Sequence, residues 1–197
     1  MASPDRQHVP MVEAGTGRVG KVRVAMVCLG NICRSPMAEA VGQAMVDQAG
    51  LNDRVVVESF GTAGYHVGSG ADPRSLAALR RRGWPPPRAR ARRLTADDIA
   101  RCAVLLCADH HNMSDVRRLA RGESDRAKVH LLRSFDPAAA AGDDEVPDPW
   151  GGGAGDFDHA LALIESACRG LVDHLADRTR KGGDPGVWRP VRGCRAD

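Results

Sequence analysis

An apolar run that ends at a cysteine is the feature that most constrains the fold of this chain. Residues 22–27 read Val-Arg-Val-Ala-Met-Val and lead directly into Cys28. After five intervening residues come Arg34 and Ser35, and then Pro36, a residue that suits the first turn of a helix. This pattern predicts a buried strand, a tight loop and a helix, with the thiol of Cys28 at the mouth of the loop.

The loop after this strand is predicted to bind an oxyanion. Backbone N–H groups and the positive end of the following helix would surround the anion, and Arg34 can donate to two of its oxygens. The same donors, with the hydroxyl of Ser35, favour a thiolate on Cys28 that can attack phosphorus. The alternative is a buried structural cysteine with Arg34 at the surface. The predicted phosphate-binding residues are Leu29, Gly30, Asn31, Ile32, Cys33, Arg34 and Ser35.

Composition narrows the class of protein. The chain has 197 residues, a net charge of +3 and only 4% aromatic residues, which favours a single domain and argues against a dedicated nucleic-acid binder. Its six cysteines show no paired CxxC spacing, so we expect reduced thiols and no structural metal. Neither an apolar run of membrane-spanning length nor a signal-peptide pattern occurs, so we expect a cytoplasmic protein without a membrane partner.

Apolar strand-like runs alternate with helical patterns along the chain. The pattern predicts strands at 22–27, 55–59, 103–107 and 129–132, and helices at 36–48, 73–82, 110–121 and 157–177. Such alternation predicts an α/β fold with a parallel sheet that is covered by helices on both faces. We expect one domain over 21–177, with a disordered extension at 1–20 and a disordered basic tail at 178–197.

Capping residues support these helix boundaries. Aspartates precede three of the helices, and glycines follow three of them. The residues are Asp72, Asp109 and Asp156 for the starts, and Gly50, Gly83 and Gly122 for the ends.

A long loop, 136–150, supplies a candidate acid. It ends in Val-Pro-Asp-Pro-Trp, in which two prolines restrict the backbone around Asp148. Trp150 could exclude water from the reacting group, so Asp148 is the predicted general acid. A simple turn aspartate before a proline is the alternative.

Taken together, these motifs resemble the low-molecular-weight protein tyrosine phosphatases. The matching stretches are 28–40, 61–68, 71–74, 107–112, 132–137 and 148–150, and they spread over about 21–177. The resemblance implies a four-stranded parallel sheet, a phosphocysteine intermediate on Cys28, and Asp148 as acid and then base. It also implies tyrosine-phosphorylated proteins as partners, inorganic phosphate as product, no cofactor or metal, and a monomer.

The resemblance further implies a substrate slot with aromatic walls. Tyr65 matches a wall position at which stacking favours phosphotyrosine, and Thr62 and His66 belong to the same stretch. On the other side stands Trp150, followed by Gly151 where many family members have a second tyrosine. Cys33 matches a partner that can form a reversible disulfide with Cys28 in the family, although a small packed side chain is an equal alternative.

Other activities of the same fold remain as alternatives. An arsenate reductase needs two further relay cysteines, and here Cys107 occupies the first position but Ser114 the second. The phosphoarginine phosphatases typically have threonine where this chain has Ile32. A module that only binds phosphate would need neither a nucleophile nor an acid. The arginines at 80–82, 88, 90, 92 and 93 could attract anions, but a solvated helix edge and loop is the favoured interpretation.

Overall fold

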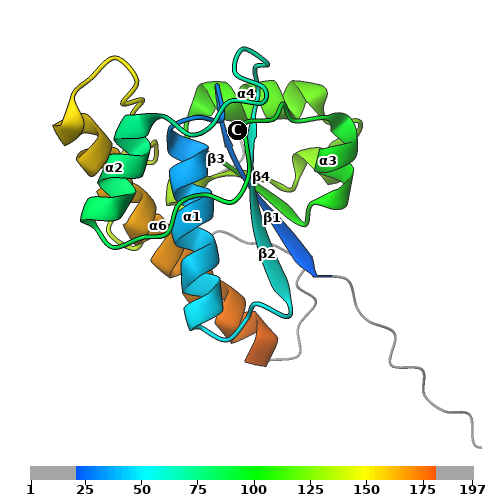
Figure 1. Ribbon diagram of the computed structural model, residues 1–197. Coiled ribbons are helices and arrows are strands. Elements are labelled where there is room, and N and C mark those ends of the chain that lie inside the picture. Colours follow the sequence, from blue (N-terminus) through cyan, green and yellow to red (C-terminus); the bar gives the residue numbers. More distant parts are fainter. Residues whose placement is uncertain (1–20, 181–197) are drawn as a thin grey trace, which may run out of the picture.

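A four-stranded parallel sheet lies at the centre of the molecule (Figure 1). The computed structural model describes residues 21–180. The strands are β1 (Val22–Cys28), β2 (Val55–Gly61), β3 (Val104–Cys107) and β4 (Val129–Leu131), in the order β2-β1-β3-β4 across the sheet. All neighbouring strands run parallel, which confirms the predicted fold class.

Helices cover both faces of this sheet (Figure 1). Each helix expected from the sequence is present, with ends displaced by a few residues, and three short helical segments were not expected. One of them, α3, carries a signal that could have revealed it, because Thr95 and Asp98 form a capping box. The helices are α1 (Arg34–Gln48), α2 (Pro73–Arg81), α3 (Ala96–Arg101), α4 (His110–Leu119), α5 (Glu123–Arg126), the 3-10 helix η1 (Leu132–Phe135) and α6 (Ala154–Arg180).

Alternate side chains of β1 enter two different hydrophobic cores. Val24 and Met26 pack with α1, α2 and α6, whereas Ala25 and Val27 pack with α3 and α4. All four side chains are at most 1% exposed. Because burying an aliphatic side chain stabilises a fold by about 1.5–3 kcal/mol, this double burial holds β1 firmly and fixes the position at which it ends. Cys28 is the last residue of that strand.

Most predicted caps are confirmed. Asp72 accepts a hydrogen bond from the N–H of Arg74 at the start of α2, and Asp109 accepts one from the N–H of Asn112 at the start of α4. Gly50 and Gly83 follow α1 and α2 with φ of 68° and 76°, the left-handed backbone that ends many helices.

Two predicted caps are corrected. Helix α6 begins at Ala154, so Asp156 lies in its first turn, where its Oδ2 accepts from the N–H of Gly153 at 2.8 Å. Helix α4 ends at Leu119 because the next residue turns to an extended backbone, and Gly122 stands before α5 instead.

The ends of the chain are only partly described. Helix α6 continues to Arg180, three residues beyond the predicted boundary at 177. The predicted disorder of 1–20 and of 181–197 lies outside the described residues. Within residues 21–180, no helix combines the length and the apolar character that crossing a membrane requires.

Candidate active site

Three strands of the sheet end together at the site. Cys28, the last residue of β1, lies opposite Gly61 at the end of β2, and Val27 lies opposite Cys107 at the end of β3. The helices that follow β1 and β3 cover opposite faces of the sheet. Between two such strands the chain leaves a crevice at the carboxyl edge, which is where parallel α/β sheets bind ligands.

The loop between β1 and α1 presents unused hydrogen-bond donors. Among residues 21–180, no backbone or side-chain acceptor receives the N–H groups of residues 29–33. Arg34 and Ser35 form the first turn of α1, in which N–H groups have no acceptor within the helix. These donors and the positive end of the helix can bind an anion, as the sequence predicted.

Asn31 holds the loop in shape from behind. It is 2% exposed and has a φ of 55°, a left-handed conformation that asparagine tolerates better than most residues. Its Nδ2 donates to Ser35 Oγ at 2.9 Å, and its Oδ1 accepts from the N–H of Arg92 at 2.9 Å. A Cβ added at Gly30 would lie 3.0 Å from the His66 ring, so a larger residue there would displace that ring by a few tenths of an ångström.

The hydroxyl of Ser35 is the side-chain hydrogen-bond partner of the Cys28 sulfur among residues 21–180. The Sγ atom lies 3.0 Å from Ser35 Oγ, and both residues are buried. The same hydroxyl lies 3.2 Å from the carbonyl oxygen of Phe60. Its single proton can therefore be donated either to the sulfur or to that carbonyl. The arrangement accommodates both the thiol and the thiolate form of Cys28.

Arg34 is the buried cation of the site. It is 3% exposed, and its guanidinium donates to Asp109 Oδ2 at 2.6 Å and to Asp148 Oδ2 at 2.9 Å. Burial alone lowers the pKa of Arg34, but the negative charges of Cys28, Asp148 and Asp109 outweigh burial and raise that pKa above its usual value. The site therefore has a permanently charged donor next to the sulfur.

Asp109 is a site residue that the predicted set did not include. Its Oδ1 caps α4 while its Oδ2 holds Arg34, so one side chain performs both tasks. The sequence signal was its position directly after the end of a buried strand, beside a helix start. That signal by itself indicated only the cap, although Asp109 also belongs to the stretch 107–112 that resembles the family and matches a residue near the phosphate loop there.

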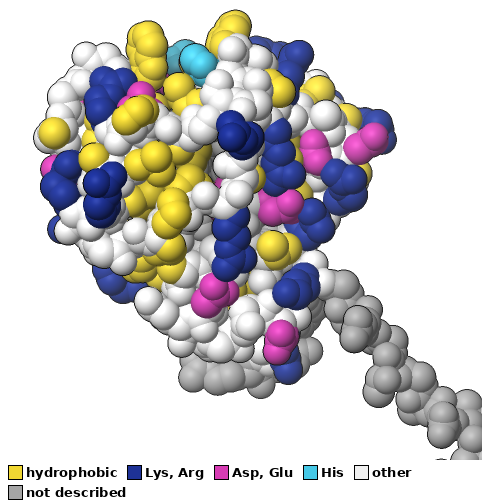
Figure 2. All heavy atoms as spheres, viewed as in Figure 1, with side chains coloured by type: hydrophobic (Ala, Val, Ile, Leu, Met, Phe, Trp, Pro, Cys, Tyr) yellow, Lys and Arg dark blue, Asp and Glu magenta, His cyan; other side chains and the backbone are white. Residues whose placement is uncertain are grey.

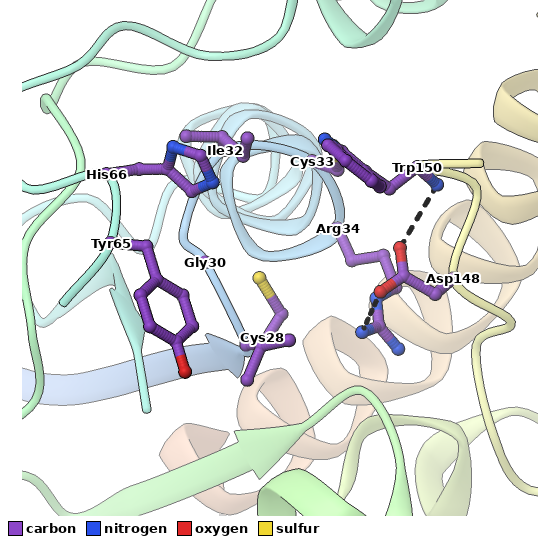
Figure 3. Close-up of a pocket in the computed structure, with 10 residues that line it drawn as sticks. Cys28, Gly30, Ile32, Cys33, Arg34, Tyr65, His66, Asp148 and Trp150 are labelled. Carbon is purple, nitrogen blue, oxygen red and sulfur yellow. Dashed lines mark hydrogen bonds and ion pairs between the residues drawn. The ribbon is translucent and has the colours of Figure 1, made fainter. Parts of the chain in front are cut away.

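The thiol and the arginine open into a pocket of about 240 Å³ (Figure 3). Tyr65 and His66 stand on one side of the sulfur, and Asp148 and Trp150 stand on the other. Tyr65 is 80% exposed and Trp150 is 59% exposed, so both rings are available to a substrate. Leu29, Gly30, Ile32 and Cys33 complete the lining.

The predicted walls of the pocket differ from the structure at Thr62 and are incomplete at Gly151. Thr62 does not line this pocket but a neighbouring groove, and its Oγ1 is buried without a hydrogen-bond partner among residues 21–180. The reason is that Thr62 still follows the line of β2, with its N–H bonded to the carbonyl of Cys28. A Cβ added at Gly151 would meet no atom within 4 Å, so the position of the missing second aromatic is open space.

Cys33 shares the pocket with Cys28 but differs in its chemistry. Burial raises the pKa of the Cys33 thiol to about 12, and the negative charges of Asp72 and Cys28 act in the same direction. At neutral pH Cys33 is therefore a protonated thiol and a poor nucleophile.

An anion-binding loop with a thiol at its base, on a parallel α/β sheet, is typical of one class of enzyme: phosphatases that attack phosphorus with cysteine. Comparison with known proteins gives the family. The family model described as low molecular weight phosphotyrosine protein phosphatase matches residues 23–181. The chain belongs to this family.

Individual relatives and solved structures support this family assignment. A low molecular weight protein-tyrosine-phosphatase of Streptomyces coelicolor is 48% identical over 150 residues, which cover 76% of this chain and 91% of that protein. A crystal structure of a protein tyrosine phosphatase from Entamoeba histolytica superposes with a TM-score of 0.76 at 29% identity, over 81% of this chain and 99% of that one. An arginine phosphatase, YwlE of Bacillus subtilis, is also similar, with a TM-score of 0.70 at 25% identity over 81% and 99%.

Proposed function

We propose that this protein hydrolyses phosphotyrosine in proteins, with Cys28 as the nucleophile, Arg34 as the phosphate-binding cation and Asp148 as general acid and base. One observation carries the proposal. The sulfur of Cys28, the unused loop donors, Arg34 and the carboxylate of Asp148 all line or border a single pocket with exposed aromatic walls.

In the first step the sulfur of Cys28 attacks phosphorus, and the bond from phosphorus to the tyrosine oxygen breaks. The loop N–H groups and Arg34 hold the three non-bridging oxygens, whose charge they match as it redistributes in the transition state. Asp148 gives its proton to the departing phenolic oxygen, so tyrosine leaves as a neutral side chain. The product of this step is a phosphocysteine.

In the second step water attacks the same phosphorus atom. Asp148, now a carboxylate, accepts a proton from that water, and the bond from sulfur to phosphorus breaks. Inorganic phosphate and the thiolate of Cys28 are the products, and Asp148 is protonated again for the next cycle.

The ion pair between Arg34 and Asp148 suggests how binding prepares the acid. Arg34 Nη2 donates to Asp148 Oδ2 at 2.9 Å, and an incoming phosphoryl oxygen can take over that donor. Binding of the phosphoryl group thereby releases the Asp148 carboxyl from Arg34 for its role at the leaving oxygen.

The pocket favours an aryl ester over the alternatives. Tyr65 and Trp150 offer two aromatic surfaces to a phenyl ring, and Ile32 adds an apolar contact where the phosphoarginine phosphatases typically have threonine. For an arsenate reductase, Cys107 would be the first relay thiol. It is fully buried in β3, which raises its pKa and protects it from reaction.

A comparison of substrates tests the proposal. Phosphotyrosine, phosphoserine, phosphoarginine and arsenate are offered to the same enzyme, with and without a thiol reductant. We expect hydrolysis of phosphotyrosine to be fastest by at least about tenfold. Faster turnover of phosphoarginine, or a reaction of arsenate that consumes reductant, would replace this proposal with one of the two alternatives.

We further propose that Cys33 protects Cys28 against oxidation. Hydrogen peroxide converts the Cys28 thiolate into a sulfenic acid with release of hydroxide. The Cys33 sulfur, which lines the same pocket, then displaces that oxygen while its thiol proton leaves with the hydroxyl as water, which gives a disulfide. Because the pKa of Cys33 is raised, we expect this second step to be slow at neutral pH. A dithiol would restore both thiols. The predictions that the protein acts as a monomer and in the cytoplasm stay predictions.

A further inference from the structure

A second depression adjoins the active-site pocket on the side of Tyr65. Its volume is about 510 Å³, and Leu29, Thr62, Tyr65 and Arg93 are among the residues that line it. Leu29 and Tyr65 also line the active-site pocket. A peptide that carries its phosphorylated side chain into the pocket can therefore lay neighbouring residues in this groove.

The groove is bordered by a segment that pairs with the Tyr65 loop. The N–H of Ala91 donates to the carbonyl of Ser69 at 2.9 Å, and the N–H of Leu94 donates to the carbonyl of Gly61 at 2.8 Å. Arg93 projects from this segment into the lining of the groove. Its backbone is thus fixed relative to the substrate pocket while its side chain stays exposed.

The side chain of Arg93 differs from its neighbours in having no charged or hydrogen-bonding partner among residues 21–180. The side chains of Arg88 and Arg92 form ion pairs with Asp47 and Glu58. Arg93 makes no ion pair or side-chain hydrogen bond with any residue in the described part of the chain, 21–180.

The other charges of the groove cancel. Arg118 is paired with Asp115, and both residues line the same groove. Arg93 therefore leaves the groove with one positive charge that is not neutralised. Figure 2 shows Lys and Arg side chains spread over the face of the molecule drawn there, with Asp and Glu side chains among them.

We propose that this groove receives residues that flank the phosphotyrosine of a protein substrate, and that Arg93 selects an acidic side chain among them. The inference rests on the proposed function and names a preference within it. Its basis is the continuity of groove and pocket together with the complementarity between an unpaired guanidinium and a carboxylate. Because Arg93 is exposed, the preference should weaken as salt is added.

Charge reversal tests this proposal. Arg93→Glu is compared with Arg80→Glu, a matched control, since Arg80 on α2 is also exposed and also lacks a side-chain partner within residues 21–180. The substrates are p-nitrophenyl phosphate and three phosphotyrosine peptides whose flanking residues are acidic, neutral or basic. The measured quantity is kcat/KM at low and at high ionic strength.

We expect Arg93→Glu to lower kcat/KM about fivefold for the acidic peptide and to raise it for the basic peptide at low salt. Turnover of p-nitrophenyl phosphate should not change, and Arg93→Gln should cause only about a twofold loss with the acidic peptide. Equal effects on all three peptides, or the same effects from Arg80→Glu, would overturn the proposal. Absence of p-nitrophenyl phosphate turnover in the unaltered protein would instead contradict the proposed function, and the groove proposal with it.

Discussion

The floor and the rim of the active-site pocket are built in opposite ways. On the floor, Asn31, Arg34 and Ser35 are 2–3% exposed and are linked by side-chain hydrogen bonds to the core. On the rim, Tyr65 and Trp150 are mostly exposed. This difference shows that the reacting groups are held by the same hydrophobic packing that holds β1 in place. The surfaces that select a substrate can change without disturbing that packing.

If the reacting groups belong to the floor, loss of its nucleophile should have the largest effect on activity. Replacing Cys28→Ser removes the thiolate but keeps the loop donors and Arg34. We expect kcat to fall by at least about 10³-fold for every substrate, while inorganic phosphate still binds. Steady-state kinetics and calorimetric titration with phosphate measure the two effects, and unchanged kcat would exclude Cys28 as nucleophile.

Asp148 lies between the floor and the rim. The effect of its loss on the rate of hydrolysis should depend on the leaving group of the substrate. Asp148→Ala removes the proton donor, so we expect phenyl phosphate to be hydrolysed about 10²-fold to 10³-fold more slowly. p-Nitrophenyl phosphate, whose leaving group is more acidic, should lose much less. Asp148→Asn serves as an isosteric control, and equal slowing of both esters would remove Asp148 from the role of acid.

Variants at Asn31 test whether the shape of the floor contributes to stability and activity independently of the reacting groups. Asn31→Ala deletes two hydrogen bonds and places alanine at a φ of 55°, so we expect a loss of about 2–4 kcal/mol in the free energy of unfolding and about tenfold in kcat. Asn31→Gly deletes the same bonds without the backbone strain and should be less damaging. Urea denaturation and kinetics measure both variants. Equal stability of the two would show that the left-handed backbone is not strained.

Changes on the rim should act on substrate binding alone. Trp150→Ala and Tyr65→Ala each remove an exposed aromatic surface, and we expect KM for phosphotyrosine peptides to rise about threefold to tenfold. The unfolding temperature should stay within about 1 °C, since neither side chain belongs to a core. A large drop in stability for either variant would show that the rim is part of the folded core.

The smallest effect is expected at Cys33, a floor residue whose side chain takes no part in the hydrolysis. Cys33→Ala should change kcat less than about twofold. Because the pKa of Cys33 is raised to about 12, iodoacetamide should leave this thiol unmodified at pH 7 and modify it increasingly as the pH rises toward 12. Peptide mapping of the alkylated protein checks this. Ready alkylation of Cys33 at neutral pH would show that the thiol is not buried as described.

The sequence predicted those parts of the site that depend on short spacings. Cys28 and Arg34 belong to one continuous motif, and Asp148 is marked by the prolines on both sides. The hydrogen bond between Arg34 and Asp109 joins residues that are 75 positions apart in the sequence. The hydrogen bond from the N–H of Arg92 to Asn31 comes from a segment without regular secondary structure. No sequence pattern predicts either contact.

The sequence also failed to predict some side-chain directions and helix ends. Thr62 lines the neighbouring groove and not the active-site pocket, because membership of the same matched stretch as Tyr65 does not say on which side of a turn a side chain lies. Asp156 stands where a cap is common, yet α6 begins two residues earlier, at Ala154. The Asp156 carboxylate accepts instead from the N–H of Gly153, inside the first turn of the helix.

The proposal that the sulfur of Cys28 becomes bonded to phosphorus can be examined in one experiment. Asp148→Ala lacks the base that assists hydrolysis, so the intermediate should accumulate when this variant is mixed with p-nitrophenyl phosphate and quenched rapidly. We predict that mass spectrometry finds one phosphoryl group, located on the peptide that contains Cys28. A phosphoryl group on another residue, or none at any time before the first turnover is complete, would contradict the mechanism.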